Sequence, residues 1–546
     1  MILGNVKSVT IYDKVVASNF DLSNQFYIES SDVGMKTRAQ ASVKKLVELN
    51  PDVDVSNYEG EINESFLGRF QVIVLVNCDD QRHFSFINEF SRKHNIGFID
   101  AQLRGLFSRV FVDFGESHLV KDVTGKDPET FTITAISKDT NAMVQVMEKG
   151  PSLHKLEVGD IVEIIEVQGM EETNGKKAKI VKIESNHSCI IDLDTSNFKD
   201  YLSGGVVKEV FQEKTLKFKP YSEVIKNPGA LDSPVFDFTK FDVQPNAHIA
   251  FQALHQFLEQ HQSLPKLLDK EDAEKFLEIA KQINQKNSAQ KTFSVEELDQ
   301  ALLINFAQYS TLQIVPMSCF LGGVVAQEVM KRTGKFKPIH QLMYYDCSEL
   351  LKEWNAGEKS LTGGRQDTQI ALFGDQFQHK IEKLKVFLVG SGALGCEWLK
   401  NLSMMGVGIV HVTDMDSIER TNLSRQFLFR ENDVGKMKST CGASAATKFN
   451  PQVKFTPLTQ PVGPDTEDVF NSAFFDELDV VVNALDNWKA RLYVDSQIVK
   501  YKKPLFERLA AHPNFQPLFS LTHFFLFFPK VELWEQQDTL KHSFQI

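Results

Sequence analysis

The sequence predicts an α/β fold made of two Rossmann-like nucleotide-binding halves, with a small β-rich domain and a helical domain inserted between them. A strand, a glycine loop and a helix follow one another from residue 386 onward, and part of this pattern recurs near the N-terminus. Between the two copies, alternating apolar residues give way to apolar residues at helical spacing. A chain of 546 residues with 42% hydrophobic composition is long enough for several globular domains.

The glycine loop follows an apolar strand at residues 386–389 and reads Gly390-Ser391-Gly392-Ala393-Leu394-Gly395. Bare backbone N–H groups at the start of the next helix can face a phosphate. A second strand ends at Asp414, about 24 residues after Gly390, where a carboxylate can hold a ribose hydroxyl. Up to this point, the dinucleotide site of a nicotinamide dehydrogenase explains the pattern as well as a nucleoside triphosphate site does.

The residues after Asp414 favour nucleotidyl transfer. Two cations and two amides follow, a set that a triphosphate under attack needs and a hydride-transfer site does not: Asn422, Arg425, Gln426 and Lys438. Further on, an apolar run at 480–482 leads to Asp486, a carboxylate suited to Mg²⁺. Asp416 is a weaker candidate for the site, because a capping role at the following turn explains it equally well.

An internal repeat supports the assignment. At an offset of 401 residues, Ser8–Asp13 matches Ile409–Asp414, and further matches place Gln25-Phe26 on Gln426-Phe427 and Asp32-Val33-Gly34 on Asp433-Val434-Gly435. Such agreement at one offset indicates duplication. At the positions that correspond to Asn422, Arg425 and Lys438, the first copy has Asp21, Asn24 and Thr37. We therefore expect the first copy to be structural and without phosphate cations, and the sequence shows no strand and glycine loop ahead of it.

The two insertions have different patterns. Alternating Val and Ile residues, broken by turns such as Gly159-Asp160 and Asn174-Gly175, predict a small antiparallel barrel. Residues 273–280 carry apolar side chains at helical spacing, and Ser294-x-x-Glu297 predicts the capping box of another helix. His248, His255 and His261 are spaced by seven and six residues, which is not the i, i+4 pair of a helical metal site.

Composition limits the partners. A net charge of −12 argues against a nucleic-acid partner and suits a basic protein. Six cysteines without a CxxC pair predict reduced, structural thiols. The apolar run at 518–528 is too short to span a bilayer, so no membrane partner is expected.

The sequence contains the segments TDMDSIERTNLSRQFLF and VNALDN, and it joins one altered and one intact half in a single chain. In these features it resembles the single-chain ubiquitin-activating enzymes. The resemblance covers residues 1–507 and includes DTSNFKDYLSGG, FQALHQF and GGVVAQEVMK, although Gln366 stands where an aromatic residue is usual. It implies an inactive adenylation half at 1–116 and 312–357, the first catalytic-cysteine half-domain at 117–215, a four-helix bundle at 216–311 and an active adenylation half at 358–507. The half at 1–116 and 312–357 is called the first half below, and the half at 358–507 is called the second half.

The resemblance also implies a function. We expect ATP-dependent adenylation of the C-terminal carboxylate of ubiquitin, with Mg²⁺ as cofactor, in a monomer of the cytoplasm and nucleus that works with ubiquitin-conjugating enzymes. By resemblance, Arg425 and Lys438 carry the catalytic role, Asp486 binds Mg²⁺, and the nucleotide is bound by Gly390, Gly392, Gly395, Asp414, Asn422 and Gln426.

The resemblance stops after Glu507. Residues 508–546 are expected to be an aberrant tail, arising from intron read-through and a frameshift, and to be poorly ordered. The chain is then expected to be truncated at both ends, without the catalytic-cysteine domain and the ubiquitin-fold domain. The alternative function is that of a fragment that binds ATP or ubiquitin without turnover.

Overall fold

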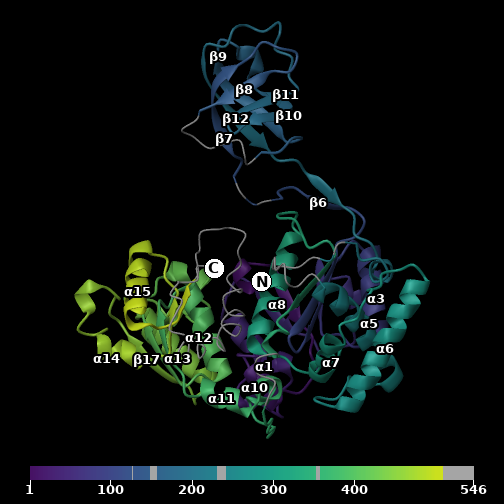
Figure 1. Cartoon of the computed structure of the whole chain (residues 1–546), viewed down its shortest axis with the longest axis vertical. Coiled ribbons are helices and arrows are strands. Elements are labelled where there is room, and N and C mark those ends of the chain that lie inside the picture. The colour runs from purple at the N-terminus through teal and green to yellow at the C-terminus, as the bar shows by residue number, and fades with distance from the viewer. Residues whose placement is uncertain are drawn as a thin grey trace. The chain divides into compact units, whose positions relative to one another are not determined.

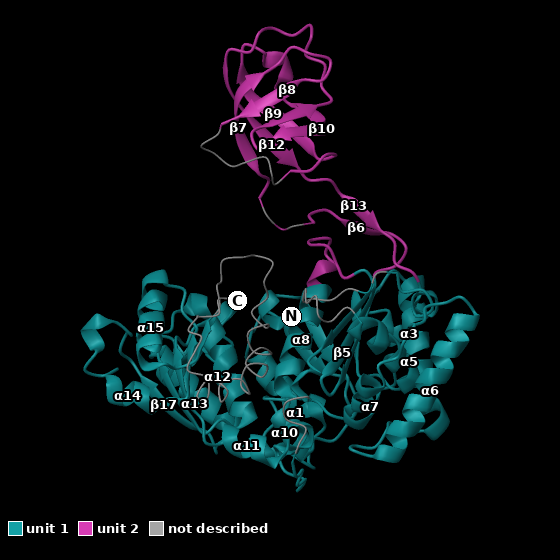
Figure 2. Ribbon diagram, viewed as in Figure 1, with its two compact units in different colours: residues 1–113, 220–329, 340–546 teal, residues 114–219, 330–339 magenta. Residues whose placement is uncertain are grey.

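The computed structural model describes residues 1–123, 125, 127–147, 156–229, 231, 242–351 and 357–507. The expectations for the tail at 508–546 lie outside the described residues. The chain divides into two compact units, of which unit 1 comprises residues 1–113, 220–329 and 340–546, and unit 2 comprises residues 114–219 and 330–339 (Figure 2). The finer domain boundaries expected from the sequence stay predictions.

The second half contains a five-stranded parallel sheet in the order β17-β16-β15-β18-β19. Its strands are β15 (Lys385–Val389), β16 (Ile409–Thr413), β17 (Lys454–Leu458), β18 (Val480–Asn483) and β19 (Leu505–Glu507). The chain crosses from β17 on one side of β15 to β18 on the other, so the strand order reverses beside β15. In open α/β sheets, ligands bind at the carboxyl ends of the strands at such a point.

The core of this sheet explains its strand sequences. Val386–Val389 and Val480–Val482 have exposures of 2% or less, as expected for parallel strands covered on both faces. The helices of the second half are α10 (Asp367–Phe373), α11 (Asp375–Ile381), α12 (Ala393–Met405), α13 (Lys438–Phe449), α14 (Ser472–Asp476) and α15 (Trp488–Tyr501) (Figure 1). The predicted Rossmann-like half is confirmed.

The first half repeats this plan in two separate sheets. A parallel pair, β1 (Ser8–Ile11) and β2 (Asp54–Asn57), corresponds to β16 and β17. A four-stranded sheet has the order β14-β5-β4-β3, with β3 (Val72–Val76), β4 (Gly97–Arg104), β5 (Phe107–Asp113) and β14 (Leu342–Asp346). In the second half β15 bonds both β16 and β18. Among the described residues of the first half, no strand joins β1 to β3 in this way. Its remaining helices are α1 (Arg38–Val47), α2 (Glu64–Leu67), α3 (Gln81–Lys93) and α8 (Val315–Lys331).

A helical bundle packs on the four-stranded sheet. Figure 1 shows α5 (Val243–His261), α6 (Lys270–Ala289) and α7 (Gln300–Tyr309) together, and the short helix α4 (Tyr221–Val224) precedes them. Phenylalanines join the two layers, for example Phe107 and Phe306, whose ring centroids lie 5.2 Å apart. Such burial of apolar surface is what holds the layers together.

A further helix follows the Ser294-x-x-Glu297 signal, as predicted, but the predicted start of that helix is wrong. Helix α7 begins instead at Gln300, with the carboxylate of Asp299 accepting from Leu302 N–H at 2.9 Å. The side chain of Asn284 pairs with both the N–H and the carbonyl of Val295, at 2.8 Å each. These tertiary bonds keep residue 295 out of a helix, so the local capping signal has no effect.

Unit 2 contains a closed six-stranded barrel, as predicted. Its strand order is β10-β11-β8-β7-β12-β9, formed by β7 (Thr130–Ile136), β8 (Met143–Val146), β9 (Ile161–Gln168), β10 (Lys176–Ser185), β11 (Ser188–Ile191) and β12 (Ser203–Val210). Val144, Ile164 and Ile180 are fully buried in its interior, as in other small barrels filled by side chains. A second, two-stranded sheet pairs β6 (His118–Val120) with β13 (Lys214–Leu216).

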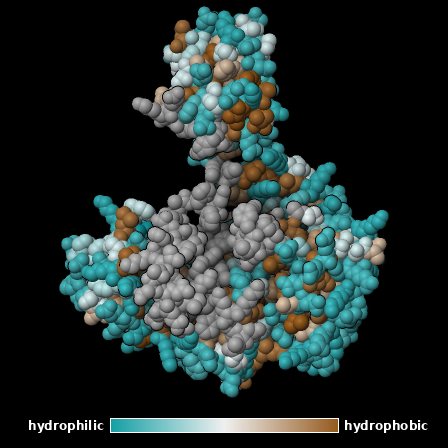
Figure 3. All heavy atoms as spheres, viewed as in Figure 1, coloured by the Kyte–Doolittle hydropathy of each residue, from teal (hydrophilic) through white to brown (hydrophobic). Residues whose placement is uncertain are grey.

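The described residues on the face seen in Figure 3 are mostly hydrophilic. On the face seen in Figure 3, apolar side chains of the described residues lie in small groups among polar ones. No helix within the described ranges is long and apolar enough to cross a membrane.

Candidate functional site

The glycine loop lies at the carboxyl end of β15. Gly390 has φ +103°, and a Cβ there would lie 2.6 Å from the carbonyl oxygen of Ala484, which follows β18. A Cβ on Gly395 would lie 2.3 Å from the Gly390 oxygen. These two glycines therefore let the turn, α12 and the end of β18 approach closely. Gly392 differs, since the nearest atom to its Cβ position is Gln426 Nε2 at 3.9 Å, so this side of the loop is open.

Asp414 lies at the end of β16, beside the loop. Its Oδ2 accepts from Ser391 N–H at 2.6 Å and its Oδ1 accepts from Asp416 N–H at 2.9 Å. Burial raises the pKa of the Asp414 carboxyl, although both hydrogen bonds and Lys438 oppose the rise. A carboxylate has about four acceptor positions, so both oxygens can still accept from a ligand. Ser391, which sequence reasoning did not single out, thus links the loop to Asp414. Its place between two glycines was the available signal.

The three residues of the Asn-x-x-Arg-Gln segment have different surroundings. Asn422 is buried, and its Oδ1 accepts from Glu419 N–H at 3.0 Å, which is a capping role. Arg425 is exposed and donates to the Thr421 carbonyl at 3.2 Å. Gln426 is buried beside Gly392, and its Oε1 has no hydrogen-bond partner among the described residues. A buried polar atom of this kind is costly unless something pairs with it, so Gln426 points to a ligand at the loop.

Lys438 is the first residue of α13 and is only 9% exposed. Its Nζ donates to Asp416 Oδ2 at 2.8 Å, and its backbone N–H donates to the Asp416 carbonyl at 3.0 Å. Its own carbonyl accepts from Ser391 Oγ at 3.3 Å. The structure therefore brings Lys438, Ser391, Asp414 and the glycine loop together, and it adds Asp416 to them as the partner of the lysine.

Asp486 is exposed in the loop between β18 and α15. Among the described residues no group of three or more His, Cys, Asp or Glu side chains could hold a metal ion. The loop is held by Arg491, a residue that sequence reasoning missed, whose Nε donates to the Leu485 carbonyl at 3.0 Å. Arg491 also pairs with Glu507 at 3.5 Å. No sequence signal identifies this pairing, because it depends on how the loop folds.

The first half retains a cation where the repeat alignment placed none. Thr37 and Met437 are the N-caps of α1 and α13, so Arg38 and Lys438 are the first residues of the two helices. Arg38 N–H donates to the Val15 carbonyl, as Lys438 N–H does to that of Asp416. The correspondence of Thr37 with Lys438 is therefore wrong, because the offset falls from 401 to 400 after Gly34. Met35, which is 79% exposed, is the additional residue.

The guanidinium of Arg38 occupies the site of the first half. Its Nε donates to Asp13 Oδ2 at 2.9 Å, and its Nη1 lies 3.5 Å from Asp21 Oδ1. Asp13 and Asp21 correspond to Asp414 and Asn422. The first half has thus kept a cation and uses it for internal ion pairs.

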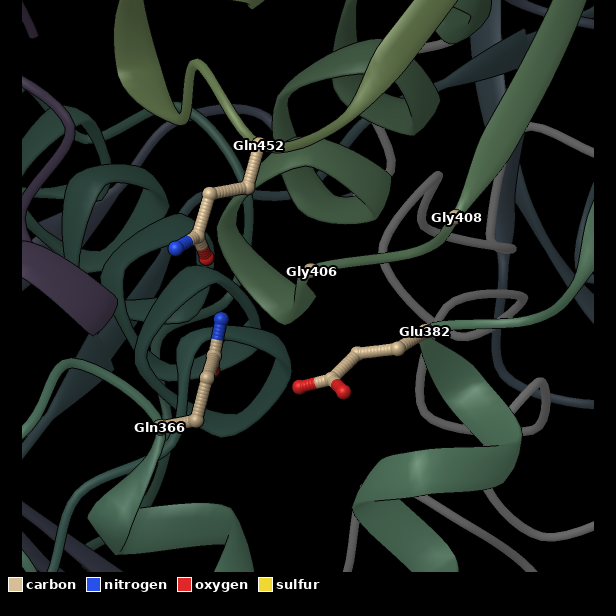
Figure 4. A pocket seen from close by; sticks show the side chains of 5 residues that line it. All are labelled: Gln366, Glu382, Gly406, Gly408 and Gln452. Atoms are coloured by element: carbon tan, nitrogen blue, oxygen red, sulfur yellow. The ribbon is translucent and has the colours of Figure 1, made fainter.

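A separate pocket of about 290 Å³ opens at the opposite edge of the second sheet. Figure 4 shows Gln366, Gln452 and Glu382 pointing toward it, with Gly406 and Gly408 on its wall. Glu382, Gly408 and Gln452 precede the amino ends of β15, β16 and β17, whereas the glycine loop and Asp414 lie at the carboxyl ends of β15 and β16. The pocket is therefore distinct from the candidate nucleotide site.

Comparison with known proteins gives three family matches. Residues 365–513 match the ThiF family, residues 212–284 the ubiquitin-activating enzyme E1 four-helix bundle, and residues 139–210 the ubiquitin-activating enzyme E1 FCCH domain. The second half is thus a ThiF-type Rossmann-like domain, accompanied by two domains that are described for ubiquitin-activating enzymes.

The chain is similar to curated enzymes over most of its length. It is 44% identical to ubiquitin-activating enzyme E1 1 of Arabidopsis thaliana over 93% of this chain and 47% of that protein. It is 42% identical to ubiquitin-like modifier-activating enzyme 1 of Homo sapiens over 93% of this chain and 48% of that protein. Over nearly its whole length the chain is therefore similar to ubiquitin-activating enzymes E1, and it spans about half the length of these relatives.

Among solved structures, a match is found to the tRNA N6-threonylcarbamoyladenosine dehydratase TcdA of E. coli in complex with ATP. It is 24% identical, covers 26% of this chain and 57% of that chain, and has a TM-score of 0.24.

Proposed function

We propose that the second half catalyses the ATP-dependent adenylation of the C-terminal carboxylate of ubiquitin. The observation that carries the proposal is the site itself. In a chain with 44% identity to a ubiquitin-activating enzyme, the glycine loop, Asp414, Gln426 and Lys438 meet at the carboxyl edge of a parallel sheet. This is the edge at which open α/β sheets bind ligands.

Each residue has a role in this proposal. Gly390, Gly392 and Gly395 form the phosphate cradle at the start of α12, where backbone N–H groups favour an anion. Asp414 holds the ribose, and Gln426, whose Nε2 lies nearest the Cβ position of Gly392, borders the phosphate cradle. Arg425 and Lys438 neutralise the phosphates, and Asn422 supports them by fixing the turn that carries Arg425.

The proposed reaction needs no general base, because the attacking carboxylate is already ionised at neutral pH. The residues must instead align the carboxylate with the α-phosphate and stabilise the charge that develops there. Lys438 suits this task, because its ammonium is mostly shielded from water and lies at the N-terminus of α13 beside the loop.

The side chains present fit a magnesium ion that arrives with the nucleotide. Mg²⁺ commonly binds through one or two carboxylates together with substrate phosphates and waters. The exposed carboxylate of Asp486 can supply such a ligand. The ion would add positive charge next to the phosphates.

Pyrophosphate exchange tests the proposal. The chain, incubated with ubiquitin, Mg-ATP and labelled pyrophosphate, should incorporate label into ATP only when ubiquitin is present. Binding of ATP without exchange would support the alternative function, a fragment that binds ATP or ubiquitin without turnover. A chain that binds neither molecule would contradict both functions.

We also propose that ubiquitin is the protein substrate, that conjugating enzymes act after it, and that the chain works as a monomer in the cytoplasm and nucleus. The acidic net charge of −12 supports a basic protein as partner. Co-sedimentation with ubiquitin measures both the interaction and the oligomeric state.

A further inference from the structure

The cations that begin α1 and α13 are paired with different carboxylates. In the first half, Arg38 pairs with Asp13 at 2.9 Å. In the second half, Lys438 pairs with Asp416 at 2.8 Å, while the carboxylate of Asp414, the counterpart of Asp13, accepts from the backbone N–H groups of Ser391 and Asp416. The two corresponding carboxylates therefore differ: Asp13 in the first half forms an ion pair with Arg38, and Asp414 in the second half forms no ion pair with Lys438.

The residue at position 416 explains this difference. Its counterpart in the first half is Val15, since the N–H of Val15 donates to Asp13 Oδ1 just as the N–H of Asp416 donates to Asp414 Oδ1, both at 2.9 Å. A valine offers no acceptor. Among the described residues, Arg38 forms ion pairs with the carboxylates of Asp13 and Asp21, whereas Lys438 forms its ion pair with Asp416.

Lys438 requires a partner in either case. It is 9% exposed, and an ammonium with so little access to water is costly unless it is paired. It also acts on Asp414 electrostatically, lowering the pKa of that carboxyl against the effect of burial. Without Asp416, Asp414 is the carboxylate that it would reach.

We propose that Asp416 is a positioning residue that holds the Lys438 ammonium away from Asp414 and so keeps the Asp414 carboxylate open to the nucleotide. The inference rests on the proposed function and adds a residue to the same site. The Asp416 side chain is 58% exposed, so the pair is held weakly and a phosphate can take the ammonium from it. Ion pairing with the more buried Asp414 would not be released so readily.

Adenosine binding tests the role of Asp416 directly, because adenosine carries a ribose but no phosphate and needs no metal. Asp416→Val copies Val15 of the first half and should weaken adenosine binding about tenfold or more, as expected when a hydrogen bond to a charged group is lost. Lys438→Ala alone should leave adenosine binding nearly unchanged. The double variant Asp416→Val/Lys438→Ala should bind adenosine like Lys438→Ala, since no cation remains to occupy Asp414.

A matched control is the substitution Asp476→Val. Asp476 is another exposed aspartate, and it is the last residue of α14, just before the amino end of β18. It should bind adenosine like the unchanged chain. Calorimetric titration of the full chain and the four variants measures all the affinities.

Two outcomes would overturn the inference while the proposed function stands. If Asp416→Val binds adenosine as the unchanged chain does, the N–H of Ser391 alone protects Asp414. If the double variant is as weak as Asp416→Val, the loss is structural damage and does not come from Lys438. An unchanged chain that binds neither adenosine nor ATP would instead refute the proposed function, and the inference with it.

Discussion

The two halves of the chain share a backbone plan and differ in how they use their charges. The carboxylate of Asp32 accepts from Glu29 N–H at 3.0 Å, and its counterpart Asp433 accepts from Arg430 N–H at 3.1 Å. These framework bonds are retained in both halves. The carboxylates at the sheet edge differ between the halves in their ion pairing. Asp13 and Asp79 of the first half pair with Arg38 and Arg104.

The second half leaves the corresponding carboxylates available. Asp79 and Asp486 each precede the N-cap of the following helix, Asp80 and Asn487, so the two aspartates correspond. No described residue forms an ion pair with Asp414 or Asp486. The comparison teaches that one backbone plan can pair its sheet-edge carboxylates internally in one half and leave the corresponding ones without an ion pair in the other.

The largest expected effect concerns a buried ion pair of the first half. Arg109 and Asp100 are 2.6 Å apart and both side chains are fully buried. Asp100→Ala should lower the free energy of unfolding by about 3 to 5 kcal/mol, because it leaves a buried cation without its carboxylate. Asp416→Ala, which breaks the half-exposed pair of the second half, should cost less than about 1 kcal/mol. Denaturant titration measures both, and equal losses would contradict the contrast between the halves.

The second-largest expected effect is that acid lowers the stability of the helical bundle that packs on the first half. Burial lowers the pKa of His248 to about 4 from an ordinary value of 6.5, and its ring nitrogens bond the Tyr344 hydroxyl and the Ile225 carbonyl. The unfolded chain takes up a proton below its ordinary pKa and the folded chain does not. Stability should therefore be lost as pH falls from about 6.5 toward 4, by at most about 1.4 kcal/mol per pH unit for this group.

Hydrogen exchange at pH 7 and pH 5 measures this effect separately in the bundle and in the second sheet. Burial also lowers the pKa of His255 well below its ordinary value, so the bundle carries two such groups. His248→Gln should reduce the acid sensitivity of the bundle. Loss of protection in the second half before the bundle would show that acid acts elsewhere.

Arg38 and Lys438, the cations that begin α1 and α13, should differ in their effect on nucleotide binding. Lys438→Ala should weaken Mg-ATP binding by about 1.5 to 3 kcal/mol, the contribution of a hydrogen bond to a charged group. Arg38→Ala at the corresponding position, like Thr37→Ala beside it, should leave ATP binding unchanged. Fluorescence titration with an ATP analogue is the measurement, and an equal loss for Arg38→Ala would mean that the first half also holds nucleotide.

The smallest expected effect is on thioester chemistry. Burial raises the pKa of Cys189 to about 11 and that of Cys396 to about 12, and it is also the first cause of the raised pKa of Cys78, Cys319 and Cys441. These thiols are poor nucleophiles at neutral pH. Incubation with ubiquitin and Mg-ATP should therefore give no adduct that a reductant removes. A band lost on mutating one cysteine would identify a nucleophile.

Much of the fold could be predicted because its signals are local. The buried run at 386–389, the turn glycines and the alternating residues of the barrel each depend on near neighbours in sequence, and the parallel sheet and closed barrel are confirmed. Sequence reasoning failed where distant groups intervene. The capping signal at Ser294 is overridden by Asn284, and the extra residue Met35 shifts the register of the repeat so that Arg38 replaces Thr37.

The sequence alone determined which groups are available to the site: three loop glycines, a carboxylate at each of two strand ends, and the cations that follow. These follow from residue type and spacing, which set backbone freedom and charge. Only the tertiary structure decided which charges meet. Lys438 pairs with Asp416, 22 residues away, and Arg38 with Asp13, 25 residues away. Side chains so far apart in sequence are brought together by the packing of helices on the sheet, which no local pattern encodes.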